Sequence, residues 1–263
     1  MADVQTGTYP IADEVLQLSR ALVNDMLRTT GGRILTNTAN FTLPYLNSAI
    51  RRVVRYMADN GAPVLIKDNV ILTNLTPTPS SDPATQVSVT ANGYFDGVNQ
   101  NAQPVLPADL ILPLRLWERA TGSQANFAEM TQPNDGITSQ VPGSWFQNWE
   151  WRQDGIYLPG STQAEDLRVR YAAMLASIGT NADLTKTSIP IRDGQEALAY
   201  AVIMQYGFAR GSALRTEAET MMKEQCDLLI SRQTRKDQRR VFRPSGFGSS
   251  GQSIDSALLG STK

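Results

Sequence analysis

The stretch of sequence that decides the fold is Asp193-Gly-Gln-Glu-Ala-Leu-Ala-Tyr-Ala-Val-Ile-Met-Gln-Tyr-Gly-Phe208. It begins with a helix-start signature, because Asp193 offers an acceptor that caps a helix and Glu196 reaches back to that cap. Residues 197–208 are apolar on nearly every side of such a helix. A helix with this pattern is buried all round. The stretch therefore predicts a helix at the centre of a bundle.

Three more segments repeat apolar residues at steps of three and four, which is the spacing of one helix face. They span residues 13–30, residues 43–59 and a segment that starts near Ala213 or Thr216. Two helices therefore precede the middle of the chain and two follow it. This order predicts an antiparallel helical bundle, formed by residues 1–61 and 179–231.

Between the two pairs of helices the chain changes character. From Pro63 to about Ile178 it is rich in Pro, Gly, Asn, Thr and Val, and short runs alternate apolar and polar residues as strands do. The clearest run is Trp149-Glu-Trp-Arg-Gln-Asp-Gly-Ile-Tyr-Leu158, in which Asp154-Gly155 suits a tight hairpin turn. The predicted fold class is α+β, with a β-rich insertion at residues 62–178.

Two further groups of side chains are notable in these segments. The four tryptophans all fall in the insertion and indicate a core or cross-strand cluster rather than a ligand cage: Trp117, Trp145, Trp149 and Trp151. Three arginines lie off the apolar stripe of residues 43–59, namely Arg51, Arg52 and Arg55. These arginines form either a solvated face or a face that contacts a subunit or partner.

Positive charge is concentrated near the C-terminus. The chain has a formal net charge of −1, whereas residues 232–243 carry six cations against Asp237, a local charge of +5. The rest of the chain therefore carries −6, so a mildly acidic body bears a basic arm. The arm continues as Gly- and Ser-rich residues and ends in an apolar patch from Ile254 to Leu259. We expect residues 232–263 to form an extended arm.

The basic run has three interpretations. Its cations can neutralise the phosphates of a nucleic acid. They can dock on an acidic protein surface through bidentate Arg–carboxylate contacts. They can also end a helix in solvent, where positive charge is favourable. Val241, Phe242 and Phe247 favour the protein surface, because apolar groups between arginines suit the core of an interface.

Most enzyme chemistry is disfavoured. The chain has no histidine, the commonest acid–base and metal-binding side chain near neutral pH. Its single cysteine, Cys226, lies among apolar residues and is expected to be buried and unreactive. Gly246-Phe-Gly-Ser-Ser-Gly251 matches a dinucleotide fingerprint in its letters only, without a flanking strand and helix. We expect no catalytic residue, no cofactor and no metal site.

One enzymatic alternative remains, a carboxylate-based cell-wall hydrolase. Such an enzyme needs two carboxyl groups at a suitable separation, and acidic residues gather near the hairpin: Glu150, Asp154, Glu165 and Asp166. The sequence shows no signal peptide, and its longest apolar run, Ala197 to Met204, is far shorter than the roughly 20 residues of a membrane-spanning helix.

The chain resembles the head-to-tail adaptor proteins of tailed bacteriophages, also called connector or neck proteins. The resemblance covers most of residues 10–243 and is carried by the order of the elements and by these stretches: Leu46-Asn-Ser-Ala-Ile-Arg-Arg-Val-Val54, Leu106-Pro-Ala-Asp-Leu-Ile-Leu-Pro-Leu-Arg-Leu-Trp-Glu-Arg119, the hairpin from Trp149 to Gly160, Asp166-Leu-Arg-Val-Arg-Tyr171, Ile189-Pro-Ile191, Glu196-Ala-Leu-Ala-Tyr200 and Tyr206-Gly-Phe-Ala-Arg-Gly211.

This resemblance implies a structural virion protein, made in the bacterial cytoplasm, that forms a ring at the head–tail junction. Rings of this family are generally dodecameric, bind beneath the portal protein, extend the DNA channel and present a docking surface to the next tail or nozzle protein. DNA passes through without sequence-specific binding, and no membrane is involved.

The resemblance also implies which residues meet these partners. The arm would bind the portal through Arg232, Arg235, Lys236, Arg239, Arg240, Phe242, Arg243, Phe247, Ile254, Leu258 and Leu259. Contacts with neighbouring copies or with the tail would involve Arg51, Arg52, Arg55, Trp145, Trp149 and Trp151.

Overall fold

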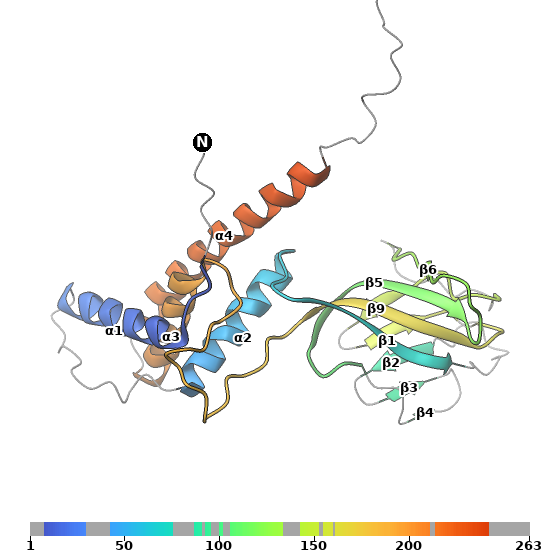
Figure 1. Ribbon diagram of the computed structural model, residues 1–263, viewed down its shortest axis with the longest axis horizontal. Coiled ribbons are helices and arrows are strands. Elements are labelled where there is room, and N and C mark those ends of the chain that lie inside the picture. Colours follow the sequence, from blue (N-terminus) through green and yellow to red (C-terminus); the bar gives the residue numbers. More distant parts are fainter. Residues whose placement is uncertain are drawn as a thin grey trace, which may run out of the picture.

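The computed structural model of the protein describes residues 8–29, 43–75, 87–90, 93–95, 100–101, 106–133, 143–152, 155–159, 161–210 and 214–241. Within these residues it forms four helices and two antiparallel sheets. The helices lie at one end of the molecule and the strands at the other (Figure 1). The prediction of a mixed fold, with helices from both ends of the sequence and strands from its middle, is confirmed.

The helices pack around the one that the apolar stretch predicts to be central. α1 spans Ala12–Thr29, α2 spans Leu43–Asp59, α3 spans Gln195–Arg210 and α4 spans Leu214–Val241. Helix α3 contacts each of the other three. Seven of the eight residues in 197–204 are buried, and the eighth, Tyr200, is half-buried. The absence of a polar face on α3 thus reflects neighbours on several sides.

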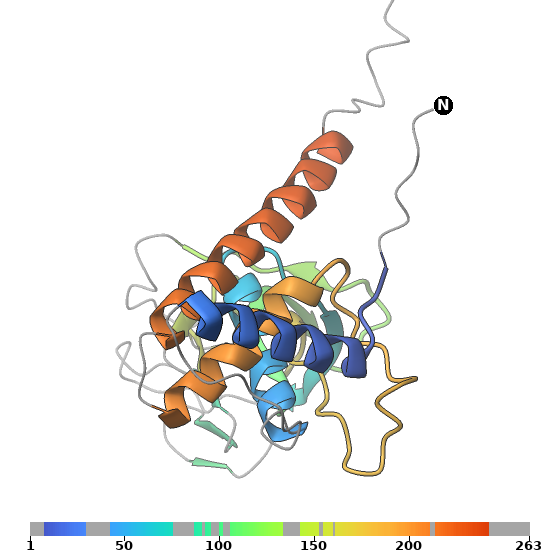
Figure 2. The same ribbon diagram turned by 90° about the vertical axis from the view of Figure 1, so that its left-hand side faces the viewer.

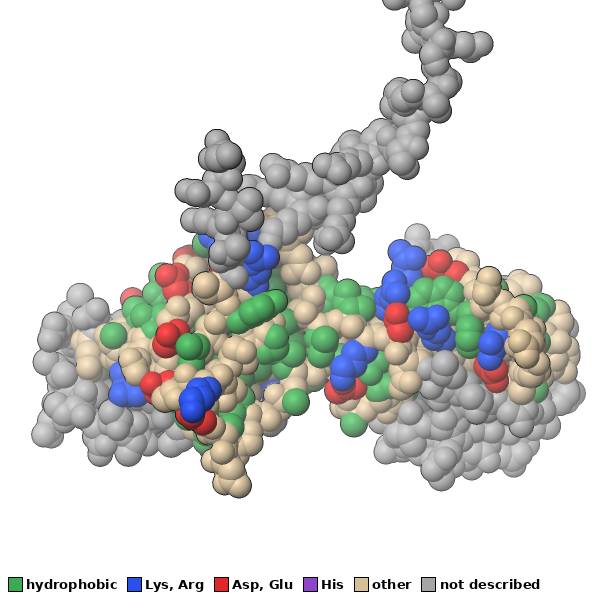
Figure 3. Space-filling view, in the orientation of Figure 1, with side chains coloured by type: hydrophobic (Ala, Val, Ile, Leu, Met, Phe, Trp, Pro, Cys, Tyr) green, Lys and Arg blue, Asp and Glu red, His purple; other side chains and the backbone are tan. Residues whose placement is uncertain are grey.

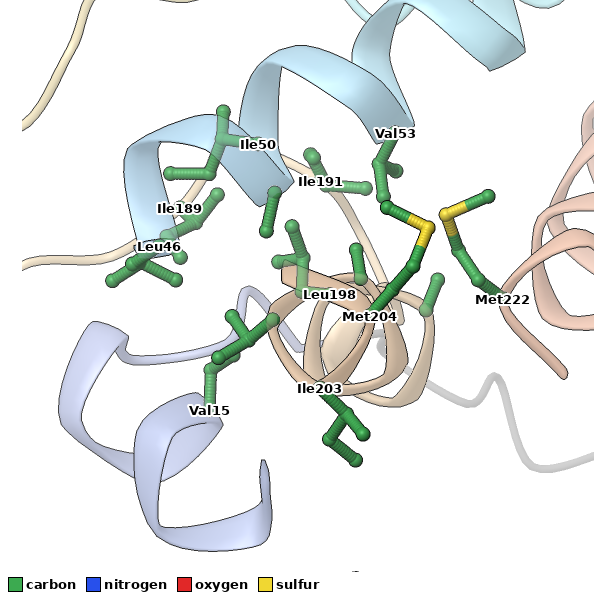
Figure 4. Packing of buried hydrophobic residues seen from close by; sticks show 14 of the residues in the cluster. Val15, Leu46, Ile50, Val53, Ile189, Ile191, Leu198, Ile203, Met204 and Met222 are labelled. Carbon is green, nitrogen blue, oxygen red and sulfur yellow. The ribbon is translucent and has the colours of Figure 1, made fainter. Parts of the chain in front are cut away.

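Aliphatic and methionine side chains fill the space between the helices. Ten of those in Figure 4 are each at most 3% exposed: Val15, Leu46, Ile50, Val53, Ile189, Ile191, Leu198, Ile203, Met204 and Met222. Cys226 of α4 belongs to the same cluster. The expectation of a buried cysteine is confirmed, and this burial raises the pKa of the thiol to about 12.

The start of α3 differs from the prediction by one residue. Gly194, not Asp193, occupies the cap position, because Gln195 is the first helical residue and the Gly194 carbonyl accepts the Leu198 amide at 3.0 Å. Asp193 has a φ of 57°, a left-handed conformation that places it in the turn before the helix. A side chain at position 194 would collide with Ile191, since a Cβ there would lie 2.5 Å from Ile191 Cγ2. Because the backbone at position 194 packs this closely against Ile191, the cap position requires glycine.

The strands form two sheets. The first has the order β1-β9-β5-β6. Its strands are Ile66–Leu75 (β1), Glu165–Ala173 (β9), Leu110–Ala120 (β5) and Ala128–Glu129 (β6). The second has the order β4-β3-β2-β8-β7. Its strands are Gln100–Asn101 (β4), Gly93–Phe95 (β3), Val87–Thr90 (β2), Gly155–Leu158 (β8) and Glu150–Arg152 (β7). Every pairing between these strands is antiparallel.

The two sheets share a second hydrophobic core. Leu116 of β5 and Leu167 of β9 belong to the same buried cluster as Ile156 and Leu158 of β8. Trp149, just before β7, is 2% exposed and lies in this cluster as well. Side chains from the inner faces of the sheets therefore meet, as in a β-sandwich.

The hairpin predicted at residues 149–158 is present, with its turn displaced by one residue. Trp151 of β7 pairs with Ile156 of β8, and Arg152 pairs with Gly155. Gly155 is thus the first residue of a strand, whereas the prediction placed Asp154 and Gly155 together in the turn. Asp154 lies outside the described residues.

The basic segment also differs from the prediction, because α4 continues to Val241. Residues 232–241, expected to be part of an extended arm, have a helical backbone. Arg, Lys and Gln are good helix formers and dominate this segment, which explains the continuation. Residues 242–263, including Phe242, Arg243 and the Ile254–Leu259 patch, lie outside the described residues.

Candidate functional site

The end of α4 is the feature that stands apart from the packed body. In two perpendicular views its C-terminal part extends beyond the other helices (Figures 1 and 2). Leu229 is the last residue of α4 in the buried cluster between the helices. Two contacts hold the helix where it leaves the body: the Arg232 Nη1 lies 3.9 Å from the Asp193 carboxylate, and Gln233 Nε2 donates to the Pro63 carbonyl at 3.4 Å.

The predicted partner-binding residues divide into three groups. The side chain of Arg232 is 62% exposed at the base of the projection. Four others lie on the projecting backbone of α4: Arg235, Lys236, Arg239 and Arg240. The remaining six lie outside the described residues: Phe242, Arg243, Phe247, Ile254, Leu258 and Leu259. Positions 232, 235 and 239 are three and four residues apart in the sequence, as are positions 232, 236 and 240, which is the spacing of positions on one helix face.

The three arginines of α2 are exposed. This fits both a solvated face and a face that contacts a subunit or partner. Arg51 donates to Ser177 Oγ at 3.1 Å, and Arg52 Nη1 lies 3.4 Å from the sulfur of Met204. Arg51 therefore also ties α2 to the segment that follows β9. Beside it, Asn47 holds Ile178 at both backbone groups, donating to the carbonyl at 3.0 Å and accepting from the amide at 2.9 Å.

The four tryptophans do not form a single cluster. Trp149 lies in the core of the sheets and Trp151 packs against that core. Trp145 is half-buried. Trp117 lies on the outer face of β5, where the guanidinium groups of Arg168 and Arg170 stand 5.6 and 5.4 Å from its ring centre. Trp149 exposes almost no surface, so it cannot contact a neighbouring copy or a tail protein.

The outer face of the first sheet is a ladder of ion pairs, which the sequence did not predict. Arg170 forms a bidentate pair with Asp68 at 2.7 and 2.9 Å, and hydrogen bonds from Arg170 lower the pKa of Asp68. Two more pairs follow at 3.0 and 3.2 Å, Arg119–Asp166 and Arg115–Glu129. Figure 3 shows the resulting mixture of positive and negative side chains on the strand-bearing end.

These ion pairs neutralise one another, so the face has little net charge to offer a charged partner. The alternation of charge was visible in Leu167-Arg-Val-Arg-Tyr171, but Asp68 lies about a hundred residues earlier in the sequence. Only the antiparallel pairing of β1 with β9 brings Asp68 opposite Arg170.

Among the described residues, the acidic side chains near the hairpin are buried or paired with arginines. Glu165 is 0% exposed and Asp166 is 5% exposed. Asp166 accepts hydrogen bonds from Arg119 and Thr121, and Glu150 accepts one from Arg152 at 2.7 Å. Asp154 lies outside the described residues. Glu165 is sealed between the two sheets and cannot reach a polymeric substrate, while Asp166 and Glu150 are engaged by arginines, so the described residues give the hydrolase hypothesis no support.

Glu165 is nevertheless an unusual group. Burial is the main cause that raises its pKa to about 7, and the nearby charges of Glu118 and Asp166 add to this. A hydrogen bond that Gln163 Nε2 donates to Glu165 Oε1 at 2.7 Å acts in the opposite direction. Its Oε2 has no hydrogen-bond partner among the described residues. Glu118 is buried beside it and accepts the backbone amides of Phe146 and Gln147 at 2.8 and 2.9 Å. Both carboxyl groups are thus buried in the core that the sheets share.

A groove lies at the base of the projecting helix. It has a volume of about 520 Å³ and is enclosed by the segment before α1, the start of α3 and the middle of α4. Its charged lining residues are Glu14, Asp193, Glu196 and Arg232. The sequence signal for Asp193 and Glu196 was interpreted as a helix start, which explains why this surface was missed.

Within the described part of the chain, no group of three or more Cys, Asp or Glu side chains is arranged to hold a metal ion. None of the described helices is both long enough and apolar enough to cross a membrane. No protein-family model matches the sequence, and no curated protein matches it significantly.

Proposed function

We propose that the protein is a structural component of the head–tail junction of a tailed bacteriophage. Copies of the chain form a ring, generally dodecameric in proteins of this kind, that joins the portal to the tail and extends the DNA channel. The chain is not an enzyme and needs no cofactor. It is made in the bacterial cytoplasm and ends in the virion, where DNA passes the ring without sequence-specific contacts.

The observation that carries this proposal is the basic end of α4, which projects from a packed body of helices. The body is an antiparallel bundle of residues 1–61 and 179–231, with the β-rich insertion at residues 62–178. The arm, residues 232–263, docks on the portal through its arginines and apolar residues. A projecting cationic helix suits a partner surface rich in carboxylates, since guanidinium groups bind carboxylates in pairs of hydrogen bonds.

The remaining contacts are assigned to two exposed surfaces. The α2 arginines, Arg51, Arg52 and Arg55, face neighbouring copies or the tail. The strand-bearing end, with the half-buried Trp145 and Trp151, meets the next tail or nozzle protein or a neighbouring copy.

Removal of residues 234–263 tests the role of the arm. This truncation keeps the Arg232 and Gln233 contacts that hold α4 against the body. The truncated protein should retain its circular dichroism spectrum and lose its attachment to DNA-filled capsids that carry a portal, as measured by co-sedimentation. Full attachment of the truncated protein would show that the arm assignment is wrong.

A matched variant separates charge from helix length. Changing Arg235, Lys236, Arg239 and Arg240 to Gln preserves good helix formers and removes four charges. Attachment should weaken and become less dependent on salt. Unchanged attachment would assign portal binding to the apolar residues beyond Val241.

Nucleic-acid binding is the second candidate, and the concentration of Arg and Lys in the sequence of the last turns of α4 is the observation that favours it. Binding to nonspecific duplex DNA through these cations would weaken steeply as salt increases. The same four-Gln variant should reduce both the affinity and the salt slope. No measurable affinity of the parent protein at low salt would exclude this function for the isolated chain.

A further inference from the structure

The groove at the base of α4 has the composition of a binding surface for a basic segment. Three carboxylates line it, from Glu14, Asp193 and Glu196, against the single cation of Arg232. Glu14 and Glu196 are exposed and form no ion pair with any described residue. Asp193 reaches Arg232 only at 3.9 Å. The groove therefore carries uncompensated negative charge.

This negative charge continues along the neighbouring helices. Burial raises the pKa of Tyr200, and the charges of Glu196, Glu217 and Glu224 raise it further, so these three carboxylates act on the same part of the surface. Glu217 and Glu224 are exposed on α4. A segment that leaves the groove along α4 would therefore meet more acidic side chains.

The groove also exposes apolar surface. Tyr9 is 56% exposed and Leu228 is 52% exposed, and both line it. They are two of the three large hydrophobic residues that are exposed among the described residues. An occupant that matches this lining is basic and carries apolar side chains.

One segment of this chain has that composition. Residues 235–243 contain Arg235, Lys236, Arg239, Arg240 and Arg243 against Asp237, together with Val241 and Phe242. No other segment of an otherwise acidic chain concentrates positive charge in this way. The groove and residues 235–243 are therefore complementary in charge and in polarity.

The groove of one copy cannot receive its own basic helix. Arg232 lines the groove, and α4 continues from it as a helix that rises about 1.5 Å per residue. Arg239 therefore lies roughly 10 Å farther along the axis. Figures 1 and 2 show this part of the helix pointing away from the body that contains the groove.

We propose that residues 235–243 of one copy bind in the groove of a second copy. Each copy then gives a helix and receives one, which is a head-to-tail interface that closes into a ring or continues as a filament. This inference rests on the proposed function for the closed ring. It reassigns residues 235–243, with their arginines, from the portal to the neighbouring copy, and leaves residues 244–263 of each arm for the portal.

Complementary charge reversals test the pairing in the full-length protein without any portal. The groove variant is Glu14→Lys with Glu196→Lys, and the arm variant is Arg235→Glu with Arg239→Glu. Sedimentation velocity at low salt should show association of the parent protein. Either variant alone should raise the apparent dissociation constant by about tenfold or more. An equimolar mixture should associate again, because each variant then offers the charge that the other lacks.

The mixture separates binding from folding. Glu14 and Glu196 also lie in the first turns of their helices, where negative charge is favourable, so the groove variant is slightly destabilised. A folding defect would persist in the mixture, whereas a charge mismatch would not. Arg115→Glu with Glu129→Lys is the matched control, since it reverses an exposed pair on the strand-bearing end and should leave association unchanged.

Three results would overturn the inference: a parent protein that is monomeric at low salt, association that survives either variant alone, or variants that associate no better together than apart. A loss of duplex-DNA binding in the arm variant without any change in association would assign the basic helix to nucleic acid. Portal attachment is measured separately, so failure of this interface and failure of the proposed function are distinguishable.

Discussion

At the scale of single residues, Glu165 shows how burial converts an ordinary carboxyl group into one that titrates near neutral pH. The side chain points into the core that the sheets share, in line with Leu167 and Val169 on β9. Ionisation there is unfavourable because water is excluded and Glu118 lies nearby. The sequence showed Glu165 only as one of several acidic residues near the hairpin and did not predict its burial, since alternation does not say which face of a strand is covered.

This burial predicts that stability falls as pH rises through a defined window. The pKa of Glu165 is about 7 in the folded protein against an ordinary value of 4.5, so the folded state holds a proton that the unfolded state releases. The stabilising effect is complete below pH 4.5 and lost by about pH 7. The loss amounts to at most about 3 kcal/mol.

Urea unfolding at several pH values measures this effect. Glu165→Gln removes the titrating group while keeping its shape, so its free energy of unfolding should vary much less between pH 5 and 8 than that of the parent. Glu118, whose pKa burial also raises, accounts for some residual slope. The lowered pKa values of Asp68 and Asp109 act below this window. Identical pH slopes in parent and variant would contradict the assignment.

At the scale of the elements, the sequence predicted helices well and strand neighbours poorly. The 43–59 helix was placed at its observed bounds, because its apolar stripe and the Asn60-Gly61 stop are local signals. The Asp68–Arg170 pair and the groove beside Arg232 join residues that are far apart in sequence. No local periodicity reports such contacts. The helical continuation of residues 232–241 was missed because their charge was interpreted before their helix propensity.

The cap of α3 gives a prediction at this scale. Gly194→Ala would place a Cβ 2.5 Å from Ile191 Cγ2 and 3.1 Å from the Ile191 carbonyl oxygen. Relief requires movement of Ile191, which is 1% exposed in the helical core. We expect a loss of about 1–3 kcal/mol in the free energy of unfolding, measured by thermal or urea denaturation.

Gly179→Ala is the control for that substitution. A Cβ at position 179 meets no atom within 4 Å. Its effect should be small or slightly stabilising, because alanine restricts the unfolded chain more than glycine does. Equal destabilisation by the two substitutions would mean that the contact with Ile191 is not the cause.

At the scale of the whole molecule, two separate hydrophobic cores lie side by side in one chain. One joins the four helices and the other joins the two sheets. The contacts between them include the packing of Ile111 of β5 against the helical core and the approach of α2 to β5. These contacts are few beside the apolar packing inside either core. The cores should therefore unfold with limited cooperativity.

Two leucine substitutions test this independence, because the chain carries its own reporters. All four tryptophans lie in the β-rich segment, so their fluorescence follows the sheets, while far-UV circular dichroism is dominated by the helices. Leu198 and Leu167 are both 0% exposed, one in each core, and each change to Ala should cost about 2–5 kcal/mol. Leu167→Ala should lower the urea midpoint of the fluorescence transition more than that of the dichroism transition, and Leu198→Ala should do the reverse. If both substitutions moved both midpoints equally, the helices and sheets would unfold as one unit.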